Sequence, residues 1–225
     1  MKLSNETVTV LKNFSTINQN VVIKEGSSIS NMSAMKNIVA KAKVKEDFTK
    51  EFAIYDLNEF LAALSLFENP DLDFKDDFVV ISNGANLKYW YSDPSVVTTP
   101  SKDVTMPESE VSFTLESNML SDVQKAAAVI GAPDMVLEAM SLGLAVLKVT
   151  DKKNSTANAF AAKVDVNNED GKDVPYKFWF KVENLKLLPG TYDVAISSKN
   201  ISHFVNTKVD VDYFIALEPE SKYDV

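Results

Sequence analysis

The sequence predicts an α+β protein built from two similar domains, each with two helices among many strands. Residues 52–64 and 178–188 both place an aromatic strand before an Asn-Leu helix, so that residue 52 of the first stretch corresponds to residue 178 of the second. An amphipathic segment with helical spacing lies upstream of each stretch, at 5–17 and 116–130. A structural unit that occurs twice favours a symmetric scaffold over a catalyst.

Length and composition are those of a globular protein. At 225 residues the chain is long enough for two domains that each bury a core. No apolar run approaches the roughly 18 residues of a membrane span, which predicts a protein without one. The first ten residues lack the apolar core of a signal peptide. The absence of cysteine excludes a disulfide framework and a thiolate zinc site, and a reducing cytoplasm fits these features.

The charge balance is acidic, and every basic residue is a lysine. The chain has 32 acidic and 23 basic residues, for a net charge of −9. It lacks arginine, the side chain best suited to bidentate contacts with phosphate and guanine. An acidic protein repels nucleic acid at long range unless its lysines gather on one surface. We therefore expect no sequence-specific reading of DNA.

The first predicted helix, 5–17, has a polar face with one lysine and no carboxylate. Ser4 is a suitable N-cap for it. Its apolar stripe consists of Val10, Leu11, Phe14 and Ile17. The opposite face consists of Asn5, Thr9, Lys12 and Thr16.

The helix predicted at 116–130 repeats this pattern. Its inward stripe is Leu120, Val123, Ala127 and Ile130. Its outward face is Asn118, Ser121, Lys125 and Ala128, with Asp122 to one side. Two acid-poor faces, each with a central lysine, fit contact with an anion and equally fit an ordinary solvated helix face.

The other two predicted helices offer less to an anion. Asp56 can cap a helix over 57–67, whose stripe is Leu57, Phe60, Leu61 and Leu64. Its far face holds Glu59, Ala62 and Leu66. A short helix near 182–188 ends at Pro189-Gly190, since neither residue continues a helix well, and Lys181 and Lys186 flank it.

Alternating segments between the helices predict strands. They lie at 21–26, 37–44, 77–82, 87–92, 144–150, 159–166, 191–197, 203–211 and 213–217. Turn residues separate several of them, at Asn83-Gly84, Asp170-Gly171 and Pro189-Gly190. The proline-containing stretch 92–110 indicates a connector, so we expect domains at 1–108 and 109–225.

Catalytic chemistry finds little support in the sequence. His203 is the only histidine and lies within a strand pattern, where a structural role is typical. Neighbouring acids at Asp71/Asp73, Asp76-Asp77 and Glu169-Asp170 could hold Mg²⁺ or flank a glycoside, but they lie beside turn residues and fit solvated loops better. No phosphate loop of the GxxxxGK[ST] type occurs. We expect a protein without enzymatic activity, metal or cofactor.

Five segments of the chain carry a family resemblance: MKLSNETVTVLKNFSTIN at the start, AIYDLNEFLAALSL at 53–66, DPSVV at 93–97, LLPGTYDV at 187–194 and FIALEPES at 214–221. Together they resemble the DNA sliding clamps of T-even-type bacteriophages. These segments span the chain in the expected order. Residues 130–175 match the family only by pattern.

The resemblance implies a polymerase processivity factor. Its subunits have two clamp domains, each with two helices packed on antiparallel β-sheets, and a homotrimer closes into a six-domain ring around duplex DNA. Helices line the hole. An ATP-driven clamp loader opens the ring, and the replicative polymerase docks a C-terminal peptide on it. Family members also serve late-gene transcription, and the resemblance implies the cytoplasm of the infected bacterial host.

The resemblance also suggests two sets of site residues. The DNA-facing set is Lys12 and Lys125, followed by Lys2 and Lys186, for which an ordinary surface position is the alternative. The partner-peptide pocket is Val96, Val97, Phe214, Ala216 and Leu217. Leu217 stands where trimeric cellular clamps typically carry proline. The alternative for Phe214 and Leu217 is a core position in a strand.

Two functions from other classes remain as alternatives. A β-rich phage virion protein would also be acidic and repetitive, and would co-purify with particles. A small carbohydrate- or peptide-binding sandwich is the other alternative, although such modules rarely need two amphipathic helices per domain.

Overall fold

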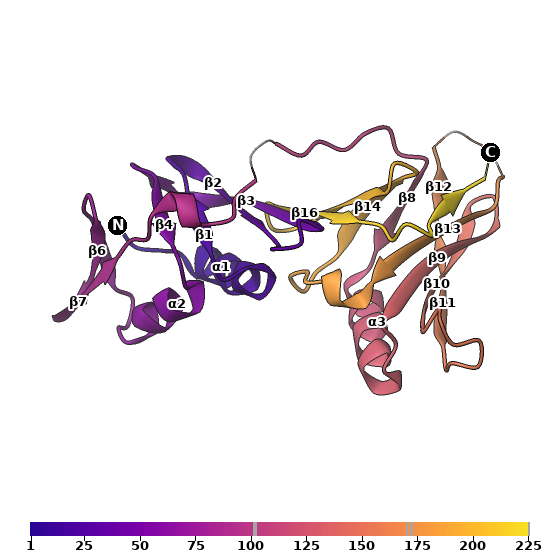
Figure 1. Cartoon of the computed structure of the whole chain (residues 1–225), viewed down its shortest axis with the longest axis horizontal. Helices are drawn as coiled ribbons and strands as arrows, with labels where there is room; N and C mark the ends of the chain where they lie inside the picture. The colour runs from indigo at the N-terminus through magenta and orange to yellow at the C-terminus, as the bar shows by residue number, and fades with distance from the viewer. Residues whose placement is uncertain (101–102, 170, 172, 225) are drawn as a thin grey trace. The chain divides into compact units, whose positions relative to one another are not determined.

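The chain forms two compact units, Met1–Asp103 and Val104–Val225, in the computed structural model (Figure 1). The structure describes residues 1–100, 103–169, 171 and 173–224. In both units the strands pair antiparallel and the helices pack beside them. The division between the units falls inside the stretch 92–110 that was expected to connect the domains.

Unit 1 contains the helices α1 (Asn5–Ile17) and α2 (Leu57–Ser65) and two sets of paired strands. The first set pairs in the order β3-β2-β1-β4. Its strands are β1 (Val21–Ile23), β2 (Gly26–Met32), β3 (Ile38–Phe48) and β4 (Phe52–Ile54). The second set, in the order β5-β6-β7, comprises β5 (Asp71–Phe74), β6 (Phe78–Asn83) and β7 (Ala85–Trp90), and a 3₁₀ turn η1 (Pro94–Val96) follows.

Unit 2 contains the helix α3 (Ser117–Ile130) and the 3₁₀ turn η2 (Val182–Asn184). One set of strands pairs in the order β11-β10-β9-β13-β17 and the other in the order β12-β8-β14-β15-β16. The strands before η2 are β8 (Val111–Leu115), β9 (Asp134–Ser141), β10 (Leu144–Thr150), β11 (Phe160–Asp165), β12 (Asn167–Asn168) and β13 (Tyr176–Lys181). Those after it are β14 (Tyr192–Ser197), β15 (Ile201–Asn206), β16 (Val211–Ala216) and β17 (Lys222–Tyr223).

The two units repeat one topology, which confirms the predicted duplication. In unit 1, β1 pairs with β2 and β4, and β2 pairs with β3. In unit 2, β9 pairs with β10 and β13, and β10 pairs with β11, in the same pattern. The series β5-β6-β7 likewise matches β14-β15-β16.

The two units also correspond in the segment that pairs with the first strand of each three-strand series, β5 in unit 1 and β14 in unit 2. Strand β8 pairs with β14 in unit 2. At the matching place in unit 1, the amino group of Met1 donates to Leu72 O at 2.9 Å, and Leu72 N donates to Met1 O at 2.7 Å. The duplicated unit is therefore a complete arrangement of strands as well as a repeated strand–helix motif.

Helices α1 and α3 form where amphipathic spacing predicts them. Ser4 Oγ caps α1 by accepting from Thr7 N at 3.2 Å, and the predicted apolar stripe is buried. Helix α3 ends at Gly131, whose positive φ of 65° suits a glycine C-cap. Ala132 N donates to Ala127 O at 2.9 Å across that end.

The predicted helix near 182–188 is wrong. One 3₁₀ turn, η2, forms there, and the following residues to Gly190 are irregular. Leu185 and Leu187 are both buried. An α-helix would direct two side chains at this spacing to nearly opposite sides, so burying both requires a non-helical backbone.

Side chains supply the hydrogen bonds that a helix would have made in this segment. Gln124 Nε2 donates to Leu185 O at 3.1 Å. The Tyr192 hydroxyl donates to Leu188 O at 2.6 Å, and Leu188 N donates to the Tyr213 hydroxyl at 3.3 Å. Burial raises the pKa of both tyrosines, so both hydroxyl groups stay neutral at physiological pH.

Several strands were missed or misplaced by pattern reading. Strand β2 has the sequence GSSISNM, in which glycine and serine replace the usual β-branched residues. Strand β9 buries four successive residues, so it lacks alternation. Strand β3 continues to Phe48, beyond the predicted end at 44, because its inward and outward positions keep alternating.

Candidate functional site

Lys12 lies exposed on the polar face of α1. The hydroxyl groups around it turn back onto the helix: Thr9 Oγ1 donates to Asn5 O at 2.7 Å, and Ser15 Oγ donates to Lys12 O at 2.9 Å. Among the carboxylates that the structure describes, none lies within 4.0 Å of the Lys12 ammonium group. This lysine is therefore available to an external anion.

The first turn of α1 is held by two successive residues of β3. Lys45 Nζ lies 2.9 Å from Glu6 Oε2. The Glu46 carboxylate is buried and accepts hydrogen bonds from Ser4 N and from the Thr7 hydroxyl. Burial alone would raise the pKa of Glu46, but these hydrogen bonds outweigh it and lower the pKa. The helix that presents Lys12 is thus fixed at its start by a buried anion.

A groove between α1 and α2 runs beside Lys12. Its volume is about 680 Å³, and apolar and polar residues contribute about equally to its lining; the apolar ones include Leu3, Val8, Leu61, Leu64, Phe67 and Leu72. Lys12 and Glu68 add opposite charges to the same lining.

Lys125 takes the equivalent place on α3. Its side chain is exposed, and Asp122, one turn earlier, is also exposed. Within the described part of the chain, no carboxylate lies within 4.0 Å of the Lys125 ammonium group. The predicted inward residues Leu120, Val123 and Ala127 are buried on the other side of the helix.

The two remaining lysines of the predicted set lie outside regular helices. Lys2 Nζ is 3.9 Å from Asp71 Oδ2, and both side chains are largely exposed. Lys186 is half-buried in the irregular segment after η2. Lys12 and Lys2 belong to unit 1, while Lys125 and Lys186 belong to unit 2.

The residues of the predicted peptide pocket also divide between the two units. In unit 1, Val96 is 60% exposed, whereas Val97 is buried in one cluster with Val22 and Ala53.

In unit 2, Phe214 and Leu217 are buried and Ala216 is half-buried. The Phe214 ring stacks on His203, with ring centroids 4.0 Å apart. His203 Nε2 in turn lies 2.7 Å from Asp212 Oδ2.

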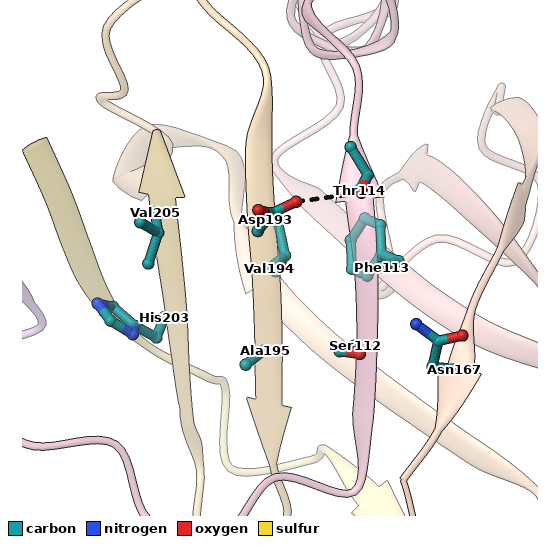
Figure 2. A pocket seen from close by; sticks show the side chains of 9 residues that line it. All are labelled: Ser112, Phe113, Thr114, Asn167, Asp193, Val194, Ala195, His203 and Val205. Carbon is teal, nitrogen blue, oxygen red and sulfur yellow. Dashed lines mark hydrogen bonds between the residues drawn. The ribbon is translucent and has the colours of Figure 1, made fainter. Parts of the chain in front are cut away.

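A shallow cavity of about 310 Å³ lies over strands β8, β12, β14 and β15 (Figure 2). Thr114 Oγ1 donates to Asp193 Oδ1 at 3.1 Å within it, and His203 and Val205 form another part of its lining. Among the described residues, no three histidine, cysteine, aspartate or glutamate side chains gather as a metal-binding group. None of the described helices is both long and apolar enough to cross a membrane.

Sequence reasoning missed the two buried carboxylates that organise these regions. Glu46 occupies an inward position of β3 between buried Val44 and Phe48. An acidic residue at a position where the strand's alternation places apolar residues could have revealed it. Asp134 is buried in unit 2, where its carboxylate accepts from Lys181 Nζ at 2.6 Å and from Lys152 N at 3.1 Å. Strand β9 does not alternate, so no comparable signal existed for Asp134.

Family models match both units. A model described as DNA polymerase processivity factor matches residues 4–78. A model described as gp45 sliding clamp, C terminal, matches residues 112–219.

Curated relatives match along nearly the whole chain. The sliding clamp of Vibrio phage KVP40 is 36% identical over 224 residues, covering 97% of this chain and 99% of that protein. The sliding clamp of Enterobacteria phage T4 is 25% identical over 229 residues, covering all of both chains.

Solved structures share the fold at low sequence identity. Proliferating cellular nuclear antigen from Entamoeba histolytica has a TM-score of 0.67 and 16% identity, covering 96% of this chain and 97% of that one. The A. fulgidus protein of the same name, solved with the C-terminal region of FEN-1, has a TM-score of 0.71 and 12% identity, covering 98% of each chain. The topology is repeated, two family models match the chain, and a relative is 36% identical over almost its full length. This chain therefore belongs to the sliding clamp family of DNA polymerase processivity factors.

Proposed function

We propose that three copies of this chain close into a six-domain ring around duplex DNA and hold the replicative polymerase on its template. The observation that carries this proposal is the duplicated topology, together with the sliding clamp relatives that match the whole chain. Two equivalent units per chain give six in a trimer. The alternative of a virion protein finds no support among the relatives.

Two sheet edges support a ring joined by strand pairing. Strand β7 ends the series β5-β6-β7, and β11 ends the series that contains β9 and β10. An edge strand offers unpaired backbone groups to another chain. Trp90, at the end of β7, is 60% exposed and adds apolar area to such a joint.

Lys12 and Lys125 are the residues we propose to face DNA, with Lys2 and Lys186 as secondary contacts. Each of the first two lies exposed on the polar face of a helix, without a carboxylate partner among the described residues. A ring holds DNA by topology, so a few flexible ammonium groups suffice and sequence reading is unnecessary. Each neutralised phosphate steepens the salt dependence by roughly 0.9 log units per log unit of salt.

We further propose that an ATP-driven loader opens the ring and that the C-terminal peptide of the polymerase docks on Val96, Val97, Phe214, Ala216 and Leu217. Late-transcription factors would use the same surface. The protein would work in the cytoplasm of the infected host without catalysis or cofactor. The resemblance of 93–97 and 214–221 to clamp segments supports this assignment.

Retention on circular DNA tests the ring. We expect protein loaded by its clamp loader and ATP to stay on nicked circular duplex DNA and to leave when the DNA is linearised. Lys12→Glu with Lys125→Glu should impair loading and processive synthesis while the oligomeric mass is unchanged. Equal retention on linear DNA would contradict the ring, and normal processivity of the double variant would remove both lysines from the site.

A substitution at Val96 tests the peptide pocket without disturbing the core, because this side chain is exposed. We expect Val96→Glu to weaken binding of a labelled polymerase C-terminal peptide by about tenfold, measured by fluorescence anisotropy. The matched control is Met35→Glu, at another exposed apolar residue of unit 1. Unchanged peptide affinity in Val96→Glu would remove this residue from the pocket.

A further inference from the structure

One face of the sheet β11-β10-β9-β13-β17 brings together lysines from four strands. Along β10, Ala145, Leu147 and Val149 are buried on the side that contacts α3. Leu144, Val146 and Lys148 alternate with them and point to the opposite face. Side chains on that opposite face therefore point away from α3.

Strand register fixes which side chains share this face. Lys148 pairs with Val136 on β9 and with Ala161 on β11. Val136 in turn pairs with Trp179 on β13. This row brings a half-buried tryptophan and a lysine to the same side of the sheet.

A second row lies beside the first. Val146 pairs with Lys163 on β11 and with Glu138 on β9. Glu138 pairs with Lys177 on β13, which pairs with Lys222 on β17. We call Lys148, Lys163, Lys177 and Lys222, with Trp179 and Val146 between them, the lysine face.

The charges of the lysine face are only partly balanced by the two carboxylates that the register places on it, Glu138 opposite Val146 and Asp165 opposite Leu144. Lys177 Nζ lies 2.6 Å from Glu138 Oε1, and this exposed pair contributes little in water. Lys222 lies directly opposite Lys177, an arrangement of like charges that destabilises a strand pair. Among the described carboxylates, none lies within 4.0 Å of the ammonium groups of Lys148, Lys163 or Lys222.

Unit 1 shows what covers the equivalent face. There Val22 on β1 pairs with Ala53 on β4, as Val136 pairs with Trp179 in unit 2. Val97 joins Val22 and Ala53 in one buried cluster.

An acid from later in the chain also reaches the strands of unit 1. Asp103 Oδ1 lies 3.6 Å from Lys41 Nζ on β3. A valine and a carboxylate that both follow η1 thus contact a sheet that bears apolar residues and a lysine.

We propose that the lysine face binds an extended acidic segment of a partner protein. Apolar side chains of that segment would lie on Trp179 and Val146, and its carboxylates would pair with Lys148, Lys163 and Lys222. Charge complementarity and the contacts of Val97 and Asp103 in unit 1 both favour this occupant over an apolar one. The surface lies within one unit of one chain and is separate from the pocket proposed for the polymerase peptide.

A fluorescein-labelled peptide of alternating glutamate and valine is the probe. We expect it to bind the intact protein at low salt, with affinity reduced at least about tenfold by Lys148→Glu, Lys163→Glu and Lys222→Glu together. The control with the same change of net charge is Lys24→Glu, Lys199→Glu and Lys208→Glu, at three other exposed lysines. Equal loss of affinity in the two triple variants would overturn the proposal, because it would show a net-charge effect alone.

Tryptophan emission locates the bound peptide. The chain has two tryptophans, Trp90 and Trp179. We expect the peptide to shift the emission of wild type and of Trp90→Phe, but not of Trp179→Phe. A shift that depends on Trp90 would overturn the assignment.

Three further controls decide the kind of ligand. A glutamate–serine peptide should bind more weakly, since equal binding would refute a role for apolar anchoring. Val96→Glu should leave affinity for the probe unchanged, and a loss there would place the probe in the polymerase pocket instead. Duplex DNA that competes with the probe, and depends on the same three lysines, would show that the face takes nucleic acid. None of these readouts requires ring closure, so they stand apart from the test of the ring.

Discussion

Glu46 shows how one buried carboxylate fixes the start of a helix. Its oxygens accept from Ser4 N and from the Thr7 hydroxyl, and the positive end of the α1 dipole favours its charge. These hydrogen bonds lower the pKa of Glu46 below its ordinary 4.5 despite burial. Stabilisation by the ionised form is therefore present above pH 4.5 and is lost as the pH falls through the lower folded-state value.

Replacing this carboxylate by an amide should destabilise unit 1. We expect Glu46→Gln to lower the free energy of unfolding by about 1–3 kcal/mol at pH 7, since an amide oxygen can replace only one of two hydrogen bonds made to a charge. Urea unfolding followed by circular dichroism measures the difference. The difference in unfolding free energy between wild type and variant should narrow below pH 4.5, because the Glu46 carboxyl of the unfolded chain binds a proton there while the folded carboxyl, with its lower pKa, stays ionised to lower pH. A gap independent of pH would contradict the ionised anchor.

At the scale of elements, sequence pattern predicted α1 and α3 well, because the residues that specify each helix lie within it or next to it in the sequence. Each has an apolar stripe at helical spacing, and α1 has its own N-cap in Ser4. The segment 185–190 could not be predicted in this way, because its hydrogen-bond partners come from Gln124, Tyr192 and Tyr213. Its shape depends on tertiary contacts that no local pattern reveals.

The same limit applies to the candidate site. Lys12 and Lys125 could be proposed from helix faces, whereas the lysine face could not. Its members lie on four strands, and only the register of those strands brings them together. A pattern within one strand does not predict which residue of another strand lies opposite it.

A substitution at Gly190 tests how tightly the irregular segment 185–190 packs on β15. A Cβ at this position would lie 2.5 Å from Asn206 Nδ2, closer than side chains tolerate. We expect Gly190→Ala to destabilise unit 2 by about 1–3 kcal/mol, measured by thermal unfolding.

The control for Gly190 is a double-mutant cycle with Asn206→Ala. The clash should disappear when the amide is removed, so the effect of the double variant should be smaller than the sum of the two single effects. Strict additivity would show that Gly190→Ala acts through something other than this contact.

At the scale of the whole molecule, duplication would allow a two-unit chain to build the six-unit ring that we propose. Units with one topology present related edges, so the same kind of joint can recur around the ring. At the end of β7, Lys88 Nζ lies 4.1 Å from the Phe78 ring centroid and 5.2 Å from that of Trp90. This exposed aromatic and cationic edge is the part of unit 1 that we expect to meet a neighbouring subunit.

Oligomeric mass tests that joint directly. Light scattering of the wild type should give a species near three times 24.9 kDa that dissociates on dilution. Trp90→Glu should shift the equilibrium toward monomer, because it removes the aromatic area from the joint and introduces a charged group that would have to lose its hydration there. Met35→Glu, at an exposed residue of the β2–β3 turn, is the matched control. A wild type that is monomeric at every concentration would contradict the homotrimer.

In both units, the first residues pair with a strand that comes much later in the sequence, and this affects how the chain folds during synthesis. Met1 bonds to Leu72 on β5, and Leu115 on β8 pairs with Tyr192 on β14. Contacts between residues so far apart in the sequence are slow to form, because the chain between them must lose conformational entropy before they can meet. A nascent chain shorter than 72 residues therefore cannot form the hydrogen bonds between Met1 and Leu72 on β5. We expect each unit to become resistant to proteolysis only after its last strands have left the ribosome.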